Sequence, residues 1–598
     1  DTPGFIANRI GVFWLQCAVA EAIALRIPIE EADAVLGAPA GAPRTGVFGL
    51  LDLVGLDLMP HVVASLDATL PADDPIRDCT GALPLVNGLI ERGYTGRKGK
   101  GGFYRLQQVD GQRQKQALNL QTGEYAASRR PRLASVEAAR RGGLRALFES
   151  RHRSADYAWR VLSRTLCYAA SLVPGIADDI VSVDTAMRLG YNWKRGPFEL
   201  IDDIGASWLV ERLHDEGRSV PALLASATDG FYRQTPGPSD RPVASGLSHL
   251  DVSGQYRPVE REDGVLLLAD IKRRGGRLAG NASASLWDIG EGVVCLEFHT
   301  KMNALDPQVL ETIHEALRIV PNGHRALVIH NDADNFSVGV NLGLALFALN
   351  IAAWDEVERI VQAGQQAYLA LRQAPFPVIG APSGMALGGG CEILLHCDAV
   401  VAHAETYMGL VESGVGLVPG WGGCTAMLRR WYTYGARPAG PMPALSRVFE
   451  LISLATVARS AHQAIDHLFL RCTDSGPDEI VMNRDRLLAR ARRKALSMSD
   501  GYAPPEPTRL RLPGASARAA MRLAVHGFQL QGKATAHDAE VADGLAEVLS
   551  GGETDWTECV DEPHLLALER AVFMRLARTP ATLARIEHML ETGRPLRN

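Results

Sequence analysis

Two acidic residues that follow glycine-rich turns are the side chains of this sequence best suited to chemistry. Glu392 ends the run M-A-L-G-G-G-C-E and leads an apolar stretch, so we expect its carboxylate to be largely buried. Glu412 stands in G-L-V-E-S-G-V-G, again between apolar residues and glycines. Buried carboxylates are costly unless they are paired or functional. These residues indicate two acids at one site, although Glu412 also fits a charge at a helix N-terminus or a satisfied loop carboxylate.

The glycine-centred turns themselves, at residues 335–342 and 385–392, add a second kind of group. A glycine-rich turn at a helix N-terminus presents free backbone N–H groups and the positive end of a helix dipole. Two such turns that face each other can hold one oxygen that gains negative charge, as in an oxyanion hole. Tight turns needed only for packing would have the same glycine content. Together with two acids, the turns favour addition of water to a carbon–carbon double bond conjugated to a thioester, which needs an enolate site, a base and an acid.

The elements that must position these groups alternate between short apolar runs and longer periodic ones. Residues 293–298 and 326–330 predict buried strands, and residues 307–320 predict a helix. This alternation is typical of an α/β fold. From about residue 480 to 598 the chain is rich in Ala, Leu and Arg and predicts helices, with a proline break at 504–507.

Residues of about 285–430 resemble the enoyl-CoA hydratase/isomerase (crotonase) family. The resemblance rests on four motifs taken together: K-M-N-A-L from residue 301, F-S-V-G-V-N-L from residue 336, M-A-L-G-G-G-C-E from residue 385, and G-L-V-E-S-G-V-G-L-V-P-G-W-G-G from residue 409. The fold it implies is a crotonase domain, a superhelix of ββα units.

This resemblance implies roles for five residues. The backbone N–H groups of Val340 and Gly389 would form the oxyanion hole. Glu392 and Glu412 would position water and move the proton, and Lys301 lies where the family begins its CoA adenine pocket. Both acids being present favours a hydratase over an isomerase, because family isomerases often keep only one.

The sequence departs from the family pattern at two places. Val340-Asn341 replaces the commoner Ala-Asp, and Trp421 stands at a turn position that usually holds a small residue. Because Val340 acts through its backbone, we expect the first change to alter the size of the acyl pocket more than the mechanism.

An internal repeat organises the first part of the chain. Asp33 and Asp52 are 19 residues apart, and Asp184 and Asp202, about 150 residues later, are 18 apart. Each pair ends in the same pattern, G-x-F-x-L-x-D-x-x-G. A period this long indicates duplication of a whole domain rather than a solenoid, and we expect one all-helical domain used twice.

The repeated part resembles the C-terminal domain of 3-hydroxyacyl-CoA dehydrogenases, through D-T-P-G-F-I-A-N-R at residue 1, G-V-F-G-L-L-D at residue 46 and the segment 99–104. The second copy resembles the duplicated domain of fused β-oxidation enzymes. By resemblance Asn8 is the active-site Asn that holds a catalytic His against the substrate. By residue type alone Asn8 would be a helix cap. The second copy shows no matching Asn.

The expected fold class is therefore α/β plus all-α. The expected segments are a first dehydrogenase C-terminal domain at 1–105, a loosely packed polar linker at 106–150, a second copy at 151–235, a linker at 236–280, a crotonase domain at 281–475 and a helical C-terminal region at 476–598.

The dehydrogenase resemblance implies NAD, which needs a βαβ unit with a G-x-G-x-x-G turn. No segment fits, because the glycines around Gly99 lack a preceding strand and a following helix. The family's catalytic His and Glu lie in that same domain, so neither is assigned here. The chain starts at Asp1, and we expect its N-terminal NAD-binding domain to be missing. The expected activity is hydration of trans-2-enoyl-CoA to 3-hydroxyacyl-CoA, without oxidation of the product.

Composition sets outer limits on function. Lys and Arg number 62 and Asp and Glu 68, a net charge of −6, so no basic excess exists to neutralise nucleic acid. The nine cysteines include no C-x-x-C spacing, which argues against a structural zinc site and a disulfide framework. No metal is expected, and no apolar run is long enough to span a membrane.

The expected location is the cytoplasm, and the expected partners are acyl-CoA thioesters and a thiolase. Two alternatives stay open: an enoyl-CoA isomerase or epimerase of the same fold, and a non-catalytic acyl-CoA-binding scaffold that docks a thiolase or a separate NAD-binding chain.

Overall fold

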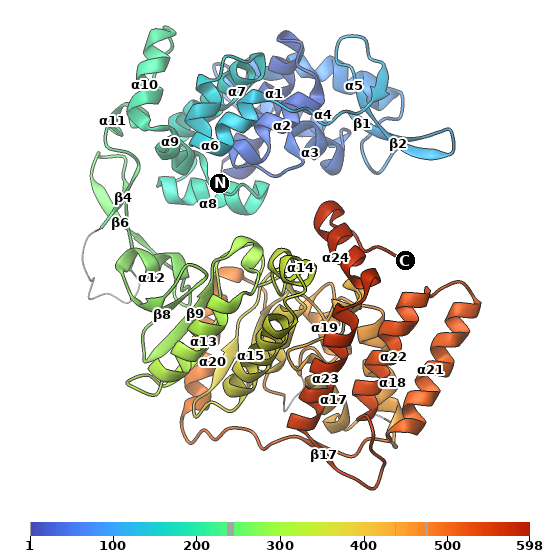
Figure 1. Cartoon of the computed structure of the whole chain (residues 1–598). Coiled ribbons are helices and arrows are strands. Elements are labelled where there is room, and N and C mark those ends of the chain that lie inside the picture. The colour runs from blue at the N-terminus through green and yellow to red at the C-terminus, as the bar shows by residue number, and fades with distance from the viewer. Residues whose placement is uncertain (1, 236–243, 437, 473–475) are drawn as a thin grey trace. The chain divides into compact units, whose positions relative to one another are not determined.

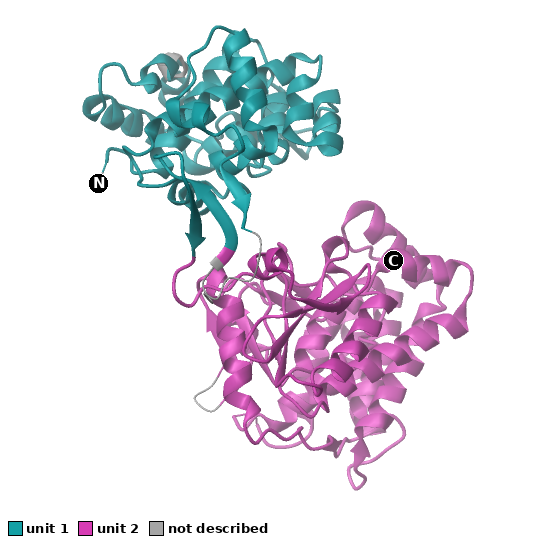
Figure 2. Ribbon diagram, turned by 90° about the vertical axis from the view of Figure 1, so that its left-hand side faces the viewer, with its two compact units in different colours: residues 1–239, 246–260 teal, residues 240–245, 261–598 magenta. Residues whose placement is uncertain are grey.

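The computed structural model describes residues 2–235, 244–436, 438–472 and 476–598 (Figure 1). The chain forms two compact units, which Figure 2 shows in different colours. Unit 1 comprises residues 1–239 and 246–260, and unit 2 comprises residues 240–245 and 261–598.

Unit 1 is mainly helical. Its described helices are α1 (Ala7–Ala24), α2 (Ile29–Leu36), η1 (Ala38–Ala40), α3 (Gly46–Val54), α4 (Leu58–Thr69), η2 (Pro75–Ala82), α5 (Leu83–Glu91), α6 (Ala134–Glu149), α7 (Arg153–Leu172), α8 (Ile180–Tyr191), α9 (Pro197–Ile204), α10 (Ala206–Asp215) and α11 (Ala222–Ser226). The two longest, α1 and α7, pack against each other. Each contributes a fully buried tryptophan, Trp14 and Trp159, to one core.

Two small sheets correct the expectation that the repeated part is all-helical. Their strands are β1 (Tyr104–Val109), β2 (Gln112–Leu118) and β3 (Tyr125–Ala127) in one, and β4 (Tyr232–Gln234), β5 (Ala244–Leu250) and β6 (Tyr256–Glu260) in the other. Each sheet follows the helices of its copy, so the repeated unit is a helical bundle with a three-stranded sheet at its end.

Residues 106–150 are correspondingly not a loosely packed linker. They contain most of the first sheet and helix α6, whose residues Leu144, Leu147 and Phe148 are buried in the core of unit 1. The arginines of α6 are exposed, and its few apolar residues are spaced to face inward. Of the expected linker at 236–280, residues 236–243 lie outside the described part, and the rest forms β5, β6, α12 (Leu268–Arg274) and β7 (Arg277–Gly280).

The sequence repeat is also a repeat of hydrogen bonds. In the first copy the Asp33 carboxylate accepts the N–H groups of Phe48 (2.8 Å) and Gly49 (3.2 Å) and the hydroxyl of Tyr104 (2.8 Å). Asp52 accepts the N–H groups of Phe103 and Tyr104, both at 2.7 Å.

The second copy contains the same network. Asp184 accepts the N–H groups of Phe198 (2.8 Å) and Glu199 (3.2 Å) and the hydroxyl of Tyr232 (2.7 Å). Asp202 accepts the N–H groups of Phe231 (2.6 Å) and Tyr232 (2.8 Å). The aspartates of the repeated pattern therefore hold each copy's helices to its sheet.

Unit 2 is built on a seven-stranded sheet within its described residues, in the order β15-β13-β11-β10-β9-β8-β7. Besides β7, its strands are β8 (Ala284–Asp288), β9 (Val293–Phe298), β10 (Ala326–Ile329), β11 (Val378–Gly380), β13 (Ala399–His403) and β15 (Glu479–Val481). β9, β10, β11, β13 and β15 are parallel; at one side β8 pairs antiparallel with β9, and β7 pairs antiparallel with β8. The strands and the helix expected at 293–298, 326–330 and 307–320 are confirmed as β9, β10 and α13.

Helices cover both faces of this sheet, as its uninterrupted apolar strands require. Val294, Leu296 and Leu327 belong to one core with α13 (Pro307–Ile319) and α15 (Trp354–Arg372). The alternate residues Cys295 and Val328 belong to another core with α20 (Leu487–Ser499).

Other helices complete the described part of unit 2 (Figure 1). They are η3 (Lys301–Asn303), α14 (Leu342–Asn350), α16 (Gly389–Leu395), η4 (Glu412–Val415), α17 (Gly423–Thr433), α18 (Met442–Ser453), α19 (Ala461–Asp466), η5 (Arg484–Arg486), α21 (Ala515–Leu530), α22 (Ala536–Ser550), α23 (Glu562–Ala577) and α24 (Pro580–Thr592). α22 packs on α18, and α23 packs on α15 and α17. The C-terminal helices thus share one hydrophobic core with the α/β part instead of forming a separate region.

Among the described helices, none is by itself long and apolar enough to cross a membrane; α3 and α4, bent by 95° at their junction, reach that length and composition only as a pair.

Candidate active site

Glu392 lies inside unit 2 at the start of a helix. Strand β12 (Met385–Leu387) leads into α16 through Gly388, whose φ of +53° suits glycine. The Glu392 side chain is 2% exposed, and its Oε1 accepts the N–H groups of Trp421 and Gly423, both at 2.9 Å. Burial raises the pKa of Glu392 to about 7, although these two N–H groups favour the ionised form.

Glu412 reaches the same place from another element. Strand β14 (Tyr407–Gly409) pairs in parallel with β12, opposing Gly409 to Leu387, and so brings the chain that follows it beside α16. Glu412 Oε1 lies 2.9 Å from the point where a Cβ on Gly388 would stand, so Gly388 leaves room for this carboxylate. Burial, followed by the charge of Glu392, raises the pKa of Glu412 well above its ordinary value.

The Glu412 carboxyl has an oxygen without a protein partner. Within the described residues, its buried Oε2 neither accepts nor donates a hydrogen bond. A buried polar atom left in this state costs free energy. Such a group is suited to bind a water molecule or a substrate atom.

The two glycine-centred turns lie side by side. Leu387 donates its N–H to the carbonyl of Ser337 (2.9 Å), and Ser337 donates its N–H to that of Met385 (2.9 Å). A Cβ on Gly339, which has a φ of +92°, would lie 3.2 Å from the nitrogen of Gly389. Glycine at 339 therefore keeps the Gly389 amide accessible.

The Val340 amide is left free by the pairing of its neighbours. Leu305 donates its N–H to the carbonyl of Gly339 (2.8 Å) and accepts the N–H of Asn341 (2.9 Å). In the described part of the chain, neither Val340 nor Gly389 donates its N–H to a protein acceptor. Two free donors at adjacent turns can hold one developing oxyanion.

The side chain of Trp421 packs against helix α15, outside the turn that contains its backbone. Its ring lies on Gly364 of α15, where a Cβ would come within 2.2 Å of it, and meets Tyr368 edge to face at 5.3 Å. Tyr368 in turn donates its hydroxyl to the carbonyl of Gly389 (2.9 Å). The large residue at 421 thus packs against the support of the Gly389 turn.

A third buried carboxylate, which the sequence reasoning missed, lies beside the two acids. Glu569 of α23 is fully buried, and its Oε2 accepts the N–H of Gly422 (3.0 Å). Its Oε1 accepts the N–H (2.8 Å) and the hydroxyl (2.5 Å) of Thr425. Helical spacing carried a signal, because Glu569 falls between Leu565 and Val572 on the buried stripe of α23.

Lys301 lies in η3 with an exposed side chain. The turn it begins is fixed to the first glycine turn, because Asn303 donates its side-chain amide to the carbonyl of Asn335 (2.8 Å) and accepts the Ser337 hydroxyl on its own carbonyl (2.7 Å).

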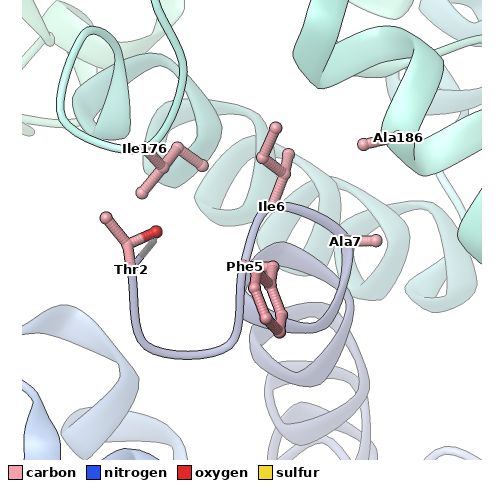
Figure 3. Close-up of a pocket in the computed structure, with 6 residues that line it drawn as sticks. All are labelled: Thr2, Phe5, Ile6, Ala7, Ile176 and Ala186. Atoms are coloured by element: carbon pink, nitrogen blue, oxygen red, sulfur yellow. The ribbon is translucent and has the colours of Figure 1, made fainter.

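Asn8 lies in unit 1, on the first turn of α1, with an exposed side chain. Ile6, not Asn8, is the N-cap residue of α1, and it makes no side-chain cap hydrogen bond. Beside this helix start is an open pocket of about 400 Å³ lined by Thr2, Phe5, Ile6, Ala7, Ile176 and Ala186 (Figure 3). Both copies contribute to its wall, since the last two residues belong to the second.

The glycine-rich segment around Gly99 does not fit NAD. It lies between α5 and strand β1, not between a strand and a helix. A Cβ on Gly102 would stand 1.9 Å from Asp52 Oδ1, so a carboxylate already occupies the inside of the turn. A pyrophosphate needs free N–H groups there and would be repelled by that charge.

Comparison with known proteins agrees with both resemblances. Residues 288–444 match the family model for enoyl-CoA hydratase/isomerase, and residues 4–106 match that for the 3-hydroxyacyl-CoA dehydrogenase C-terminal domain. A solved enoyl-CoA hydratase from Bacillus halodurans aligns with 51% of this chain and 99% of its own, at 17% identity and a TM-score of 0.35.

Several relatives match almost the entire chain. One from Bacillus subtilis, provisionally named a 3-hydroxyacyl-CoA dehydrogenase, is 34% identical over 100% of this chain and 74% of its own length. Another from Rickettsia felis, provisionally named a fatty acid oxidation complex trifunctional enzyme, is 29% identical over 99% of this chain and 74% of its own. The chain therefore belongs to the family of fused fatty acid oxidation proteins that join a 3-hydroxyacyl-CoA dehydrogenase C-terminal domain to an enoyl-CoA hydratase/isomerase domain.

Proposed function

We propose that unit 2 hydrates trans-2-enoyl-CoA to 3-hydroxyacyl-CoA. The observation that supports this most is the meeting of two free backbone amides with two buried carboxyls, one of which has an unpartnered oxygen. The amides suit a thioester oxygen, and the carboxyls suit water.

In the proposed reaction the thioester oxygen accepts the N–H groups of Val340 and Gly389. These donors stabilise the negative charge that this oxygen gains when water attacks the double bond. Glu392 and Glu412 hold the water, whose hydroxyl oxygen bonds to C3 while a proton passes through the carboxyl pair to C2. Water is thereby added across the double bond and the enzyme returns to its starting state.

The raised pKa values suit that proton transfer. Burial raises the pKa of Glu392 to about 7, and burial together with the charge of Glu392 raises the pKa of Glu412 well above its ordinary value, so the two carboxyls titrate as a coupled pair. A pair that holds one proton contains both the base that activates water and the acid that protonates carbon.

The proposal also includes a site for CoA and a metabolic setting. Lys301 faces solvent next to the first glycine turn and would meet the adenine end of CoA. Asn8 would serve a dehydrogenase step, but the glycine-rich turn around Gly99 does not fit NAD, so we expect no oxidation of the product by this chain. The proposed setting is cytoplasmic fatty-acid β-oxidation, with a thiolase as the enzyme to which products pass.

The test uses the intact chain with crotonyl-CoA in the absence of NAD. We expect absorbance of the conjugated double bond to fall and 3-hydroxybutyryl-CoA to form. Glu392→Gln should lower kcat/KM by about 10³-fold, whereas Glu405→Gln, at an exposed position of the same unit, should leave it unchanged.

Three results would overturn the proposal. Unchanged crotonyl-CoA with measurable binding would indicate a scaffold. Conversion of a 3-enoyl-CoA to its 2-enoyl isomer, without hydration of crotonyl-CoA, would indicate an isomerase. Full activity of Glu392→Gln would remove the carboxyl pair from the mechanism.

A further inference from the structure

The turn that holds Glu392 is itself held from its other side. Helix α17 begins at this turn, and four of the N–H groups near its start point at two carboxylates. Trp421 and Gly423 donate to Glu392, whereas Gly422 and Thr425 donate to Glu569. The donors alternate along the chain, so any movement of the turn changes both sets of bonds.

We propose that Glu569 is a positioning residue of the hydratase site, which fixes the 421–425 turn so that two N–H groups remain on Glu392 Oε1. This inference rests on the proposed function of unit 2. It adds a residue from α23, a helix outside the segment 288–444 that matches the hydratase/isomerase model.

The geometry gives Glu569 this role and not that of a reacting acid. Both its oxygens are engaged by the turn, and its side chain is fully buried. Gly422, the central residue, has a φ of +98°, and a Cβ there would lie 2.9 Å from the ring of His396. The turn is therefore confined between α16 and α23 with no room to adopt another path.

The charges around Glu569 make its effect measurable. Glu392 of α16 and Glu412 of η4 lie close enough for their charges to interact with that of Glu569. The thiol of Cys424 on α17 is also near Glu569, and His396, just after α16, lies beside Gly422. Burial, and after it the charge of Glu392, raises the pKa of Glu569 to about 8, and the charge of Glu569 contributes to the raised pKa of Glu412. The three carboxyls thus compete for protons, and removing one makes the others easier to ionise.

The experiment compares Glu569→Gln with wild type in crotonyl-CoA hydration across pH. Gln keeps the shape of Glu but places an NH2 group against an N–H of the turn. We expect kcat to fall on the order of 10²-fold, KM to change little, and the pH profile to move to lower pH by about one unit.

Glu562→Gln is the matched control. Glu562 lies two turns earlier on α23, is equally buried, and pairs with Arg372 and Arg429 instead of the turn. It should lower stability without moving the pH profile or the kcat of the folded fraction. A merely structural Glu569 would behave like this control.

Thr425→Val gives a second test should Glu569→Gln not fold. It removes only the hydroxyl that donates to Glu569, and we expect a smaller fall in kcat and a smaller shift in the same direction. Wild-type kcat and pH profile in either folded variant would overturn the inference. Absence of hydration by wild type would instead contradict the proposed function.

Discussion

Both units bury carboxylates, but they treat them differently. In unit 1 the carboxyl of Asp184 has donors on both oxygens, two backbone N–H groups and one tyrosine hydroxyl. In unit 2, Glu412 has a buried oxygen with no partner among the described residues. Yet burial raises the pKa of both, to about 8 for Asp184. Burial and a raised pKa therefore do not by themselves mark an acid as functional, and the unpartnered oxygen is what distinguishes Glu412 from Asp184.

The duplication strengthens this distinction. Asp33 and Asp184 each accept two backbone N–H groups and one tyrosine hydroxyl, although only the first copy has, by resemblance, a counterpart of the family's active-site Asn, Asn8. A network that persists in the copy without that Asn serves the fold. In the glycine turns of unit 2, by contrast, the amides of Val340 and Gly389 donate to no protein acceptor among the described residues.

The largest expected effect comes from changing Glu412, the acid with an unpartnered oxygen. Glu412→Gln replaces the carboxyl whose buried Oε2 has no partner among the described residues, so we expect hydration of crotonyl-CoA to fall by about 10³-fold. Because the charge of Glu392 also opposes that of Glu412, the unfolding temperature of unit 2 should stay equal or rise. Steady-state kinetics and calorimetry on one preparation measure both.

A large loss of stability with retained activity would reverse this interpretation. It would place Glu412 with the aspartates of unit 1, as a carboxyl that serves the fold.

The next largest effect comes from changing Asp184, the acid whose oxygens both accept hydrogen bonds. Asp184→Ala leaves the N–H groups of Phe198 and Glu199 and the Tyr232 hydroxyl without their acceptor, which should lower the free energy of unfolding of unit 1 by about 3 kcal/mol. Hydration by unit 2 should not change. Asp203→Ala, which removes an exposed carboxylate paired with Arg195, is the control and should cost less than about 1 kcal/mol.

The pH dependence of that loss has a definite sign. The folded-state pKa of Asp184, about 8, lies above its ordinary value. Its contribution to stability is therefore full at low pH and is lost as pH rises through about 8. Calorimetry should show a larger difference between wild type and Asp184→Ala at pH 5 than at pH 9. The opposite trend would mean that Asp184 is ionised in the folded protein.

The sequence predicts those parts of the fold whose signal lies within a short segment. The apolar runs of β9 and β10 predict buried strands, and the two G-x-F-x-L-x-D-x-x-G patterns predict the duplication. The small sheets escape prediction because strand β1, Y-R-L-Q-Q-V, is polar, has no buried residue and lacks an apolar alternation. Helix α6 was missed because its buried residues are few among arginines.

At the site, too, residues in local motifs can be predicted from the sequence, and residues brought in by the fold cannot. Glu392 and Glu412 lie in glycine-rich motifs that identify them, whereas Glu569 comes from a helix with no motif, about 150 residues beyond Glu412. Its position on the apolar stripe of α23 shows that it is buried. Only the fold shows that it meets Gly422 and Thr425.

The smallest effect sharpens the comparison between the two copies. Tyr104→Phe and Tyr232→Phe each delete one hydroxyl that donates to Asp33 or to Asp184, at 2.8 and 2.7 Å, and leave the backbone donors in place. We expect each to lower the free energy of unfolding of unit 1 by about 1 kcal/mol. Equal losses would show that the two networks contribute alike to the fold. A loss confined to Tyr104→Phe would instead mean that the copy carrying Asn8 is held more tightly, and would weaken the conclusion that these aspartates are purely structural.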